Sequence, residues 1–356
     1  MMAIFLLITL IITGLAFPRS KILFILMGIY LICVIGLRTH GTDYYFYQLE
    51  YLNAPFIYYK NADFPGWNLL MNFLINREIS FKTFLLIMAI MSVTLMLIAI
   101  YKLSLGIGRY ITFTISLFLV YPFGHEAAQM RTFIVDAIVL IAVSFLLKLE
   151  NSTKKYIINY LIYFILVLIA STFHSLAYYF IVVGIIYILL KPFKHDLKFI
   201  LIGSIGLSVL ISTGILSSVV ISFLNTSKLD HWLSDSNISM GKLIPISITI
   251  AIWLILSVEV KELDLDCINL GINRQYLDNI QHYMNTILLL IPLLTYDITF
   301  NRFWRVYLIL LYLMTGLFLY KKNSNYKKMI VGIAFFLLVI LIYIYENEAF
   351  ITSSIF

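Results

Sequence analysis

The chain alternates between long apolar runs and short polar connections along most of its 356 residues. Runs of about 16–22 apolar residues are long enough to cross the hydrocarbon core of a bilayer as α-helices, which satisfy their own backbone hydrogen bonds. The pattern predicts an all-α, polytopic integral membrane protein with one domain over residues 1–356 and about twelve transmembrane helices. The predicted spans are 2–17, 22–37, 84–101, 111–123, 127–147, 157–172, 176–190, 199–221, 242–258, 283–296, 306–320 and 329–345.

Two pairs of predicted spans have very short connections between their members. The pairs are 111–123 with 127–147 and 157–172 with 176–190, and each is compatible with two helices or with one long kinked element. The predicted number of spans is therefore open by about two.

Composition supports the membrane class. Hydrophobic residues make up 62% of the chain and charged residues 12%, whereas a soluble domain carries about 25% charged residues. Residues 1–17 lack a basic start and a cleavage site, so they are expected to be a retained helix. Cys33 and Cys267 fall in a predicted span and a predicted inner loop, so neither a disulfide nor a zinc site is expected. Lysines at one membrane face explain the net charge of +7 without a nucleic acid partner.

The positions of Lys and Arg predict how the chain crosses the membrane. One set of alternate loops holds 16 of the 25 Lys and Arg residues, and basic loops of this kind are usually cytoplasmic. Both termini are therefore expected outside. The segments expected at the outer face are 38–82, 122–131, 173–175, 222–241, 297–305 and the C-terminal tail.

The outer loop at about 38–82 is rich in aromatic residues and carries candidate chemistry at its start. Gly41 allows a tight turn that brings Arg38 and Asp43 close together. The pair then either forms a salt bridge that orders the loop, or binds a phosphate through Arg38 and a sugar hydroxyl through Asp43. Tyr44 and the tyrosines after it suit either stacking on sugars or an aromatic belt. Farther along this loop, apolar residues recur at helical spacing after Pro65-Gly66 and predict a short interfacial helix with Trp67 at headgroup depth.

Arg131 opens a long apolar run at the predicted outer face, shortly after Glu126 and Gln129. A charge in the hydrocarbon core costs about 2.5–3.5 kcal/mol, so such residues usually face a cavity and serve a function. The alternatives are that Arg131 extends to the headgroups or pairs with Glu126.

Two further segments place basic residues or a histidine at the same face. Arg302 and Arg305 share one face of a helix, where they either bind a pyrophosphate bidentately or anchor the helix at the interface. His174 interrupts a long apolar stretch at a helix corner and is either a base or a structural residue. No motif for metal or acyl-enzyme chemistry is present, so no metal and no cofactor are expected.

Four short motifs follow one another along the chain: Arg38…Gly41-Thr42-Asp43-Tyr44, Gln129-Met130-Arg131, His174-Ser175 and Arg302…Arg305-Val306-Tyr307. In this order they resemble the EpsG-like branch of the Wzy-type O-antigen and capsule polymerases. One difference is that this branch often shows an Arg-Gln pair where this chain has Gln129-Met130-Arg131.

This resemblance implies a glycosyltransferase at the outer face of the bacterial plasma membrane. The donor would be a repeat unit linked to undecaprenyl pyrophosphate and the acceptor a second lipid-linked unit, with no metal, cofactor or nucleic acid. The bilayer and a chain-length regulator are the other expected partners. In this hypothesis Arg38, Arg131, Arg302, Arg305, Gln129 and Tyr44 bind substrate, and Asp43, His174 and Glu126 are the candidate bases.

Three other functions remain open at this stage. A lipid-linked oligosaccharide flippase would also need basic residues for a pyrophosphate, but along its central cavity rather than at one face. An O-antigen ligase would use the same donor, with its large outer loop late in the chain. A structural membrane subunit would leave the outer arginines unexplained.

Overall fold

The structure is a computed structural model that describes most of the chain. The predicted outer segment 222–241 and the predicted span 329–345 lie outside the described residues, as do Thr42 and Cys267. The described residues are 2–41, 43–57, 64–148, 152–192, 196–212, 250–257, 272–290 and 301–319.

Every regular element in these ranges is helical, which confirms the predicted all-α class. The helices are α1 (Met2–Ala16), α2 (Lys21–Gly36), α3 (Tyr44–Asn53), η1 (Ala54–Phe56), α4 (Pro65–Ile75), α5 (Phe81–Ser104), α6 (Ile111–Val120), α7 (Phe123–Ala128), α8 (Met130–Leu146), α9 (Thr153–Ser171), α10 (Ala177–Leu190), α11 (Asp196–Ser212), α15 (Arg274–Ile287), η3 (Leu288–Leu290) and α17 (Asn301–Leu319).

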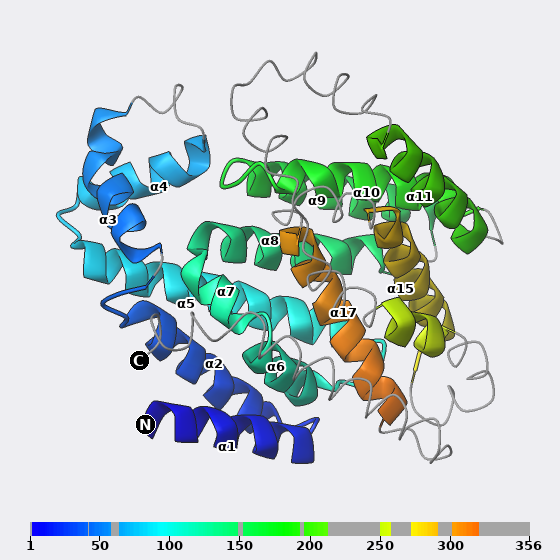
Figure 1. Ribbon diagram of the computed structural model, residues 1–356, viewed down its shortest axis with the longest axis horizontal. Coiled ribbons are helices and arrows are strands. Elements are labelled where there is room, and N and C mark those ends of the chain that lie inside the picture. Colours follow the sequence, from blue (N-terminus) through cyan, green and yellow to red (C-terminus); the bar gives the residue numbers. More distant parts are fainter. Residues whose placement is uncertain are drawn as a thin grey trace.

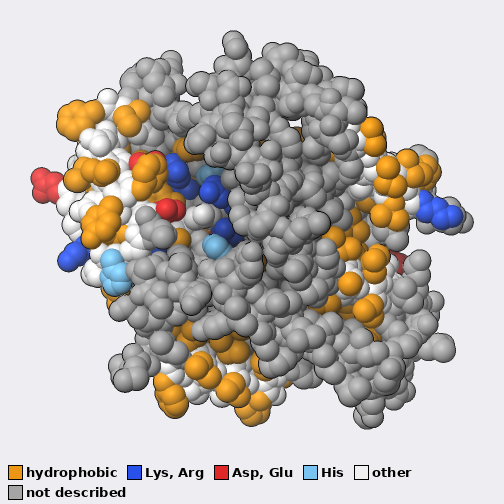
Figure 2. All heavy atoms as spheres, viewed as in Figure 1, with side chains coloured by type: hydrophobic (Ala, Val, Ile, Leu, Met, Phe, Trp, Pro, Cys, Tyr) orange, Lys and Arg blue, Asp and Glu red, His pale blue; other side chains and the backbone are white. Residues whose placement is uncertain are grey.

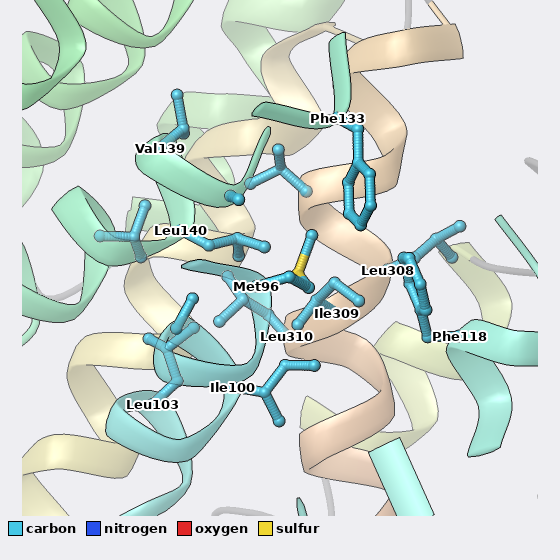
Figure 3. Packing of buried hydrophobic residues seen from close by; sticks show 14 of the residues in the cluster. Met96, Ile100, Leu103, Phe118, Phe133, Val139, Leu140, Leu308, Ile309 and Leu310 are labelled. Atoms are coloured by element: carbon cyan, nitrogen blue, oxygen red, sulfur yellow. The ribbon is translucent and has the colours of Figure 1, made fainter. Parts of the chain in front are cut away.

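The core is built around α5, which packs against α2 and α8. The helix starts after Ser80, whose hydroxyl accepts a hydrogen bond from the Thr83 N–H at 3.3 Å. Figure 3 shows Met96 of α5 between Leu140 of α8 and Ile309 of α17, all three of them buried. These apolar contacts fix the ends of α8 and α17 relative to each other.

The remaining helices surround this core (Figure 1). Helices α1 and α2 pack with α6 on one side of α5, and α9 packs between α8 and α10 on the other. Helices α3 and α4 lie together at the end of the molecule where α5 begins, and α17 crosses α6 and α8. The first residues of α3, α8 and α17 are thereby brought toward a common region.

Several described helices suit a membrane. Three are long and apolar enough to cross it, namely Phe81–Ser104, Thr153–Ser171 and Arg302–Leu319, and others are shorter but apolar. Large apolar side chains such as Ile22 and Ile202 point outward, as lipid contact requires. The chain is therefore a helical membrane protein, whereas the number of twelve spans stays a prediction.

The structure separates the spans whose connections were ambiguous. Helix α7 lies between α6 and α8, and a corner at residues 172–176 lies between α9 and α10. Helix α15 begins at Arg274, before the predicted span 283–296, because the Asn273 side chain caps it by accepting the Tyr276 N–H at 3.2 Å. Its amphipathic sequence contains no long apolar run, so the search for spans missed its first half.

The described part of the loop at 38–82 contains α3 and the short η1 in addition to the one helix predicted. The predicted helix after Pro65 is present as α4, but α3 was not expected because its exposed face is also aromatic. Trp67 is buried against Tyr47 and Phe84, and its place at headgroup depth stays a prediction. Both helices therefore pack as part of the protein core.

Candidate active site

A cavity of about 230 Å³ lies at the end of the bundle where α3, α8 and α17 begin. Basic, acidic and histidine side chains gather close together on the face drawn in Figure 2, among hydrophobic ones. The cavity combines both signs of charge with aromatic rings, as a site for a charged sugar substrate would. Its lining residues are Asp43, Phe46, Tyr47, Gln129, Arg131, Thr132, His174 and Arg302.

A tight turn before α3 places Asp43 at this cavity. Gly41 has a φ of 139°, which L side chains rarely adopt, and its carbonyl oxygen accepts the Tyr44 N–H at 3.2 Å. Asp43 is the residue that precedes α3, and Tyr47 and Glu50 follow at spacings that share its face. The predicted turn is therefore present, and it directs one polar face of α3 toward α8.

Arg131 is held by Glu50 of α3. Its Nη1 atom lies 3.0 Å from Glu50 Oε1, and the second carboxylate oxygen accepts the Trp67 Nε1–H at 3.2 Å. The guanidinium lies over the Phe64 ring, 4.6 Å from its centroid, and its Nε–H has no partner in the described protein. The predicted alternative of a pair with Glu126 is therefore wrong, and Arg131 keeps a donor for a ligand.

The first turn of α4 is attached to the corner between α9 and α10. The N–H groups of Gly66 and Trp67 lie 2.9 and 3.4 Å from the Thr172 carbonyl oxygen, so the helix start finds an acceptor. A Cβ atom on Gly66 would lie 2.2 Å from Thr172 Oγ1, so a side chain would break this approach. Phe64 stacks on His174 with ring centroids 5.1 Å apart. These contacts orient His174 at the cavity wall.

The His174 ring presents a hydrogen-bond donor to the cavity. Its Nδ1 atom accepts the Leu176 N–H at 3.1 Å, so the neutral ring carries its proton on Nε2. Burial and the nearby charges of Arg302 and Arg131 lower the pKa of His174 to about 4, so the ring is neutral near pH 7. Arg302 Nη1 lies 3.4 Å from Nε2. Both groups line the cavity, where an anionic oxygen can accept from either.

Asp43 is the acidic group of the cavity. Burial raises the pKa of its carboxyl above the ordinary value, and the charges of Arg302, Arg38 and Arg131 offset part of that rise. A carboxylate with a raised pKa is a better proton acceptor than an ordinary one.

Arg38 approaches the cavity region from the end of α2. Its Nη1 atom donates to the Ala127 carbonyl oxygen of α7, while Nε and Nη2 are buried without a partner in the described protein. No ion pair joins Arg38 to Asp43 in the part of the chain that is described, so the predicted salt bridge is absent. Buried donors without partners are costly, which suggests that Arg38 serves a ligand.

Arg305 lies one turn beyond Arg302 in a closed environment. Its Nη1 atom is 3.4 Å from Glu126 Oε1, and the two side chains are 6% and 1% exposed. Asp136 is also buried nearby, and its carboxyl group interacts with that of Glu126. We refer to Arg305, Glu126 and Asp136 as the buried ion cluster. Neither Arg305 nor Glu126 lines the cavity.

The cavity is lined by residues from each of the four short motifs that carried the resemblance. A family model described as the EpsG family matches residues 21–353. The chain belongs to the EpsG family. This membership makes it a membrane protein of polysaccharide-polymerase type and supports a general glycosyltransferase role. Comparison with curated proteins and with solved structures gave no match.

The EpsG-family structure brings five of the nine predicted site residues into one cavity. The five are Asp43, Gln129, Arg131, His174 and Arg302. The other four are placed differently: Arg38 binds the α7 backbone, Tyr44 packs edge-on against Phe81, and Arg305 pairs with Glu126. Their predicted roles stay predictions.

Two acidic residues of the site region were missed by sequence reasoning. Glu50 follows Asp43 by seven residues, a spacing that would have been informative if α3 had been recognised. Asp136 lies within the predicted span 127–147, and an acidic residue in a span is itself a functional signal. Neither residue belongs to the four short motifs that carry the resemblance.

Proposed function

We propose that this EpsG-family protein is an O-antigen or exopolysaccharide polymerase. It transfers an oligosaccharide repeat unit from undecaprenyl pyrophosphate onto a second lipid-linked unit, at the outer face of the bacterial plasma membrane. The single observation that carries this proposal is the cavity in which Asp43, His174, Arg131 and Arg302 converge from four segments of the chain. A chain-length regulator is a further candidate partner.

The basic side chains suit the pyrophosphate of such a donor. Guanidinium groups bind phosphate oxygens through two parallel hydrogen bonds, which are stronger than neutral ones. Arg131 and Arg302 line the cavity, and the unpartnered Nε and Nη2 donors of Arg38 lie close to its Asp43 side. The His174 Nε2–H adds a neutral donor beside Arg302. Together they offset the charge that develops on the leaving pyrophosphate.

Asp43 suits the acceptor hydroxyl. In the transfer step the Asp43 carboxylate takes the hydroxyl proton while the hydroxyl oxygen attacks the anomeric carbon of the donor sugar. The bond from that carbon to the pyrophosphate oxygen breaks, and its electron pair leaves with the lipid pyrophosphate. His174 is a weaker candidate for the base, because its exposed nitrogen carries the proton when Nδ1 accepts the Leu176 N–H. Glu126 is already paired with Arg305.

A flippase and a ligase remain the alternatives. A flippase should carry basic side chains along a path through the bundle, whereas three arginines near this cavity lie at one end of it. A ligase would use the same donor and the same cavity chemistry, so the acceptor alone distinguishes it from a polymerase. The experiment must therefore read out the product that accumulates.

The test is a gel of surface polysaccharide from a host that caps a lipid core with repeat units. The host's own copy of this gene is deleted. The deletion strain is then complemented with wild type, Arg302→Ala or Arg77→Ala, and each protein is present at equal abundance in the membrane. Arg77 is the matched control, because its guanidinium lies over the Phe73 ring outside the cavity. Removing one preorganised donor should lower the rate by about 10²–10³-fold.

A polymerase predicts a full ladder with wild type and Arg77→Ala, and a single repeat unit on the core with Arg302→Ala. If the deletion leaves no repeat unit on the core, a flippase or a ligase explains the protein better. An unchanged ladder after deletion would exclude all three functions.

A further inference from the structure

A second and larger hollow lies at the far ends of α5 and α8. Its volume is about 450 Å³, and Lys102, Ser144, Phe145, Lys148, Asn273 and Tyr276 belong to its lining. We call this site the basic hollow. Lys148 follows the last turn of α8, whereas Arg131 is in its first turn, and 17 helical residues span roughly 25 Å. The basic hollow is therefore separate from the candidate active site.

The lining of the basic hollow is positively charged. Two lysines contribute to it, and none of the described residues that line it is acidic. The Lys102 ammonium lies over the Phe145 ring, 4.6 Å from its centroid, which holds the cation at one wall. Two ammonium groups at one hollow are suited to bind an anion.

The depth of the basic hollow fits lipid headgroups. Helix α5 has 24 residues and is one of the three helices long and apolar enough to cross a membrane. Lys102 lies in its last turn, where the apolar part ends. The end of a span lies at the level of the phosphates, and basic pockets between helices at this level bind anionic headgroups.

An exposed apolar stripe leads from the hydrocarbon region to the basic hollow. Ile90 and Ile98 of α5 are 45% and 41% exposed, and Leu105, which follows the last residue of α5, is 46% exposed. Their spacings of eight and seven residues place them on one side of the helix, and Lys102 lies beside Ile98 and Leu105. A free phosphate would make no use of this stripe. A lipid would use both parts, because its acyl chains could lie on the stripe while its phosphate meets the lysines.

We propose that the basic hollow binds the phosphate-bearing headgroup of an anionic phospholipid, whose acyl chains lie along the exposed stripe of α5. The proposal does not depend on the polymerase function, because none of the described residues that line the hollow lines the candidate active site. The bound lipid would join the ends of α5, α8 and α15.

Native mass spectrometry of the full chain in detergent tests this proposal. The probes are phosphatidylglycerol with eight-carbon chains, phosphatidylcholine with the same chains, and inorganic phosphate. The test variant is Lys102→Gln/Lys148→Gln. The matched control is Lys21→Gln/Lys198→Gln, which removes two exposed lysines away from the hollow. A second variant, Lys102→Arg/Lys148→Arg, keeps both charges.

Wild type should retain phosphatidylglycerol through gas-phase activation, and phosphatidylcholine and phosphate should dissociate. Lys102→Gln/Lys148→Gln should bind phosphatidylglycerol about tenfold more weakly, since each lysine near an anionic surface contributes measurably. The control and the arginine variant should bind as wild type does. Equal weakening in the control would overturn the site, and retention of inorganic phosphate as strongly as the lipid would overturn the assignment to a lipid.

Discussion

Arg302 and Arg305 lie on successive turns of α17 but have opposite environments. Arg302 lines a cavity of about 230 Å³ beside His174, and Arg305 is buried against Glu126 at 3.4 Å. The first guanidinium can receive a ligand, whereas the charge of the second is already offset by a protein carboxylate. The comparison teaches that a motif with two arginines can supply one binding residue and one structural residue.

The cavity and the buried ion cluster also differ in what a lost charge would do. In the cavity, loss of the Arg302 side chain is expected to remove a contact to substrate with little effect on the fold, because no ion pair in the described protein holds it. In the cluster, a lost side chain leaves a buried partner without its counter-charge, which destabilises the fold. Activity and stability measured together on matched variants can therefore separate the two regions.

The largest effect on activity should come from Asp43→Asn. Asparagine keeps the shape of the side chain but cannot accept the proton, so polymer synthesis should fall by about 10²–10⁴-fold. The measurement is incorporation of labelled repeat units by membranes with equal amounts of protein. Asp278→Asn is the control, because Asp278 forms a surface pair with Arg274. Wild-type rates in Asp43→Asn would leave Asp43 with at most a binding role.

The next-largest effect should be a loss of stability in Glu126→Gln. This change leaves Arg305 buried without its partner and should lower the free energy of unfolding by about 3–5 kcal/mol. Asp136→Asn is the matched change in the same cluster. It should be neutral or stabilising, because one guanidinium there faces two carboxyl groups and an asparagine amide can still donate to Glu126.

Thermal unfolding of the purified protein measures both variants of the cluster. An equal loss of stability in Asp136→Asn and Glu126→Gln would mean that Arg305 is shared by both carboxylates. If Glu126→Gln unfolded as wild type does, the contrast between the cluster and the cavity would not hold.

A smaller effect on activity should distinguish the two arginines directly. Arg302→Lys loses the planar guanidinium group. The rate of polymer synthesis should therefore fall by about 10- to 100-fold, which corresponds to the loss of one charged hydrogen bond. Arg305→Lys keeps a charge opposite Glu126 and should stay within about threefold of wild type. Polymer length on gels measures both variants. If both keep full polymer length, the bidentate phosphate hypothesis fails, and if both fail equally, Arg305 also reaches the substrate.

The cavity could be anticipated from the sequence because charges stand out in apolar runs. Arg131, His174 and Arg302 each occur at the predicted outer end of a span, and helices of similar length bring such ends together. The acidic residues that pair with these arginines could not be anticipated in the same way. Glu50 lies on a helix that the aromatic sequence concealed, so its contact with Arg131 had no signal.

The different environments of Arg302 and Arg305 could not be predicted from the sequence either. A spacing of three residues places two side chains on one face of a helix, but it does not say what covers each turn. Here α7 presents Glu126 to the second turn of α17, and the corner with His174 faces the first. Helix α15 was missed for a related reason, because its buried face shows only in the periodicity and not in any apolar run.

The dependence of the transfer rate on pH should identify the base. Burial raises the pKa of Asp43 above its ordinary value of 3.8, and the pKa of His174 is lowered to about 4. Because the base must be ionised, the rate should fall about tenfold per pH unit below the Asp43 pKa. His174 stays neutral down to about pH 4, so it should cause no decline near pH 6.5. In His174→Gln, the fall in rate at low pH should occur at the same pH as in wild type. If it moves to another pH, His174 rather than Asp43 causes it.

The smallest effect should come from Tyr44→Phe, which tests the edge of the cavity. The Tyr44 ring packs edge-on against Phe81 at 5.3 Å and is buried, so its role in the structure is that of an aromatic core residue. Phenylalanine preserves this contact, and polymer synthesis should stay within about twofold of wild type. Tyr47→Phe is the informative comparison, because Tyr47 lines the cavity one turn later. A tenfold loss in Tyr44→Phe would mean that its hydroxyl contacts the sugar and that the substrate extends beyond the cavity toward the start of α5.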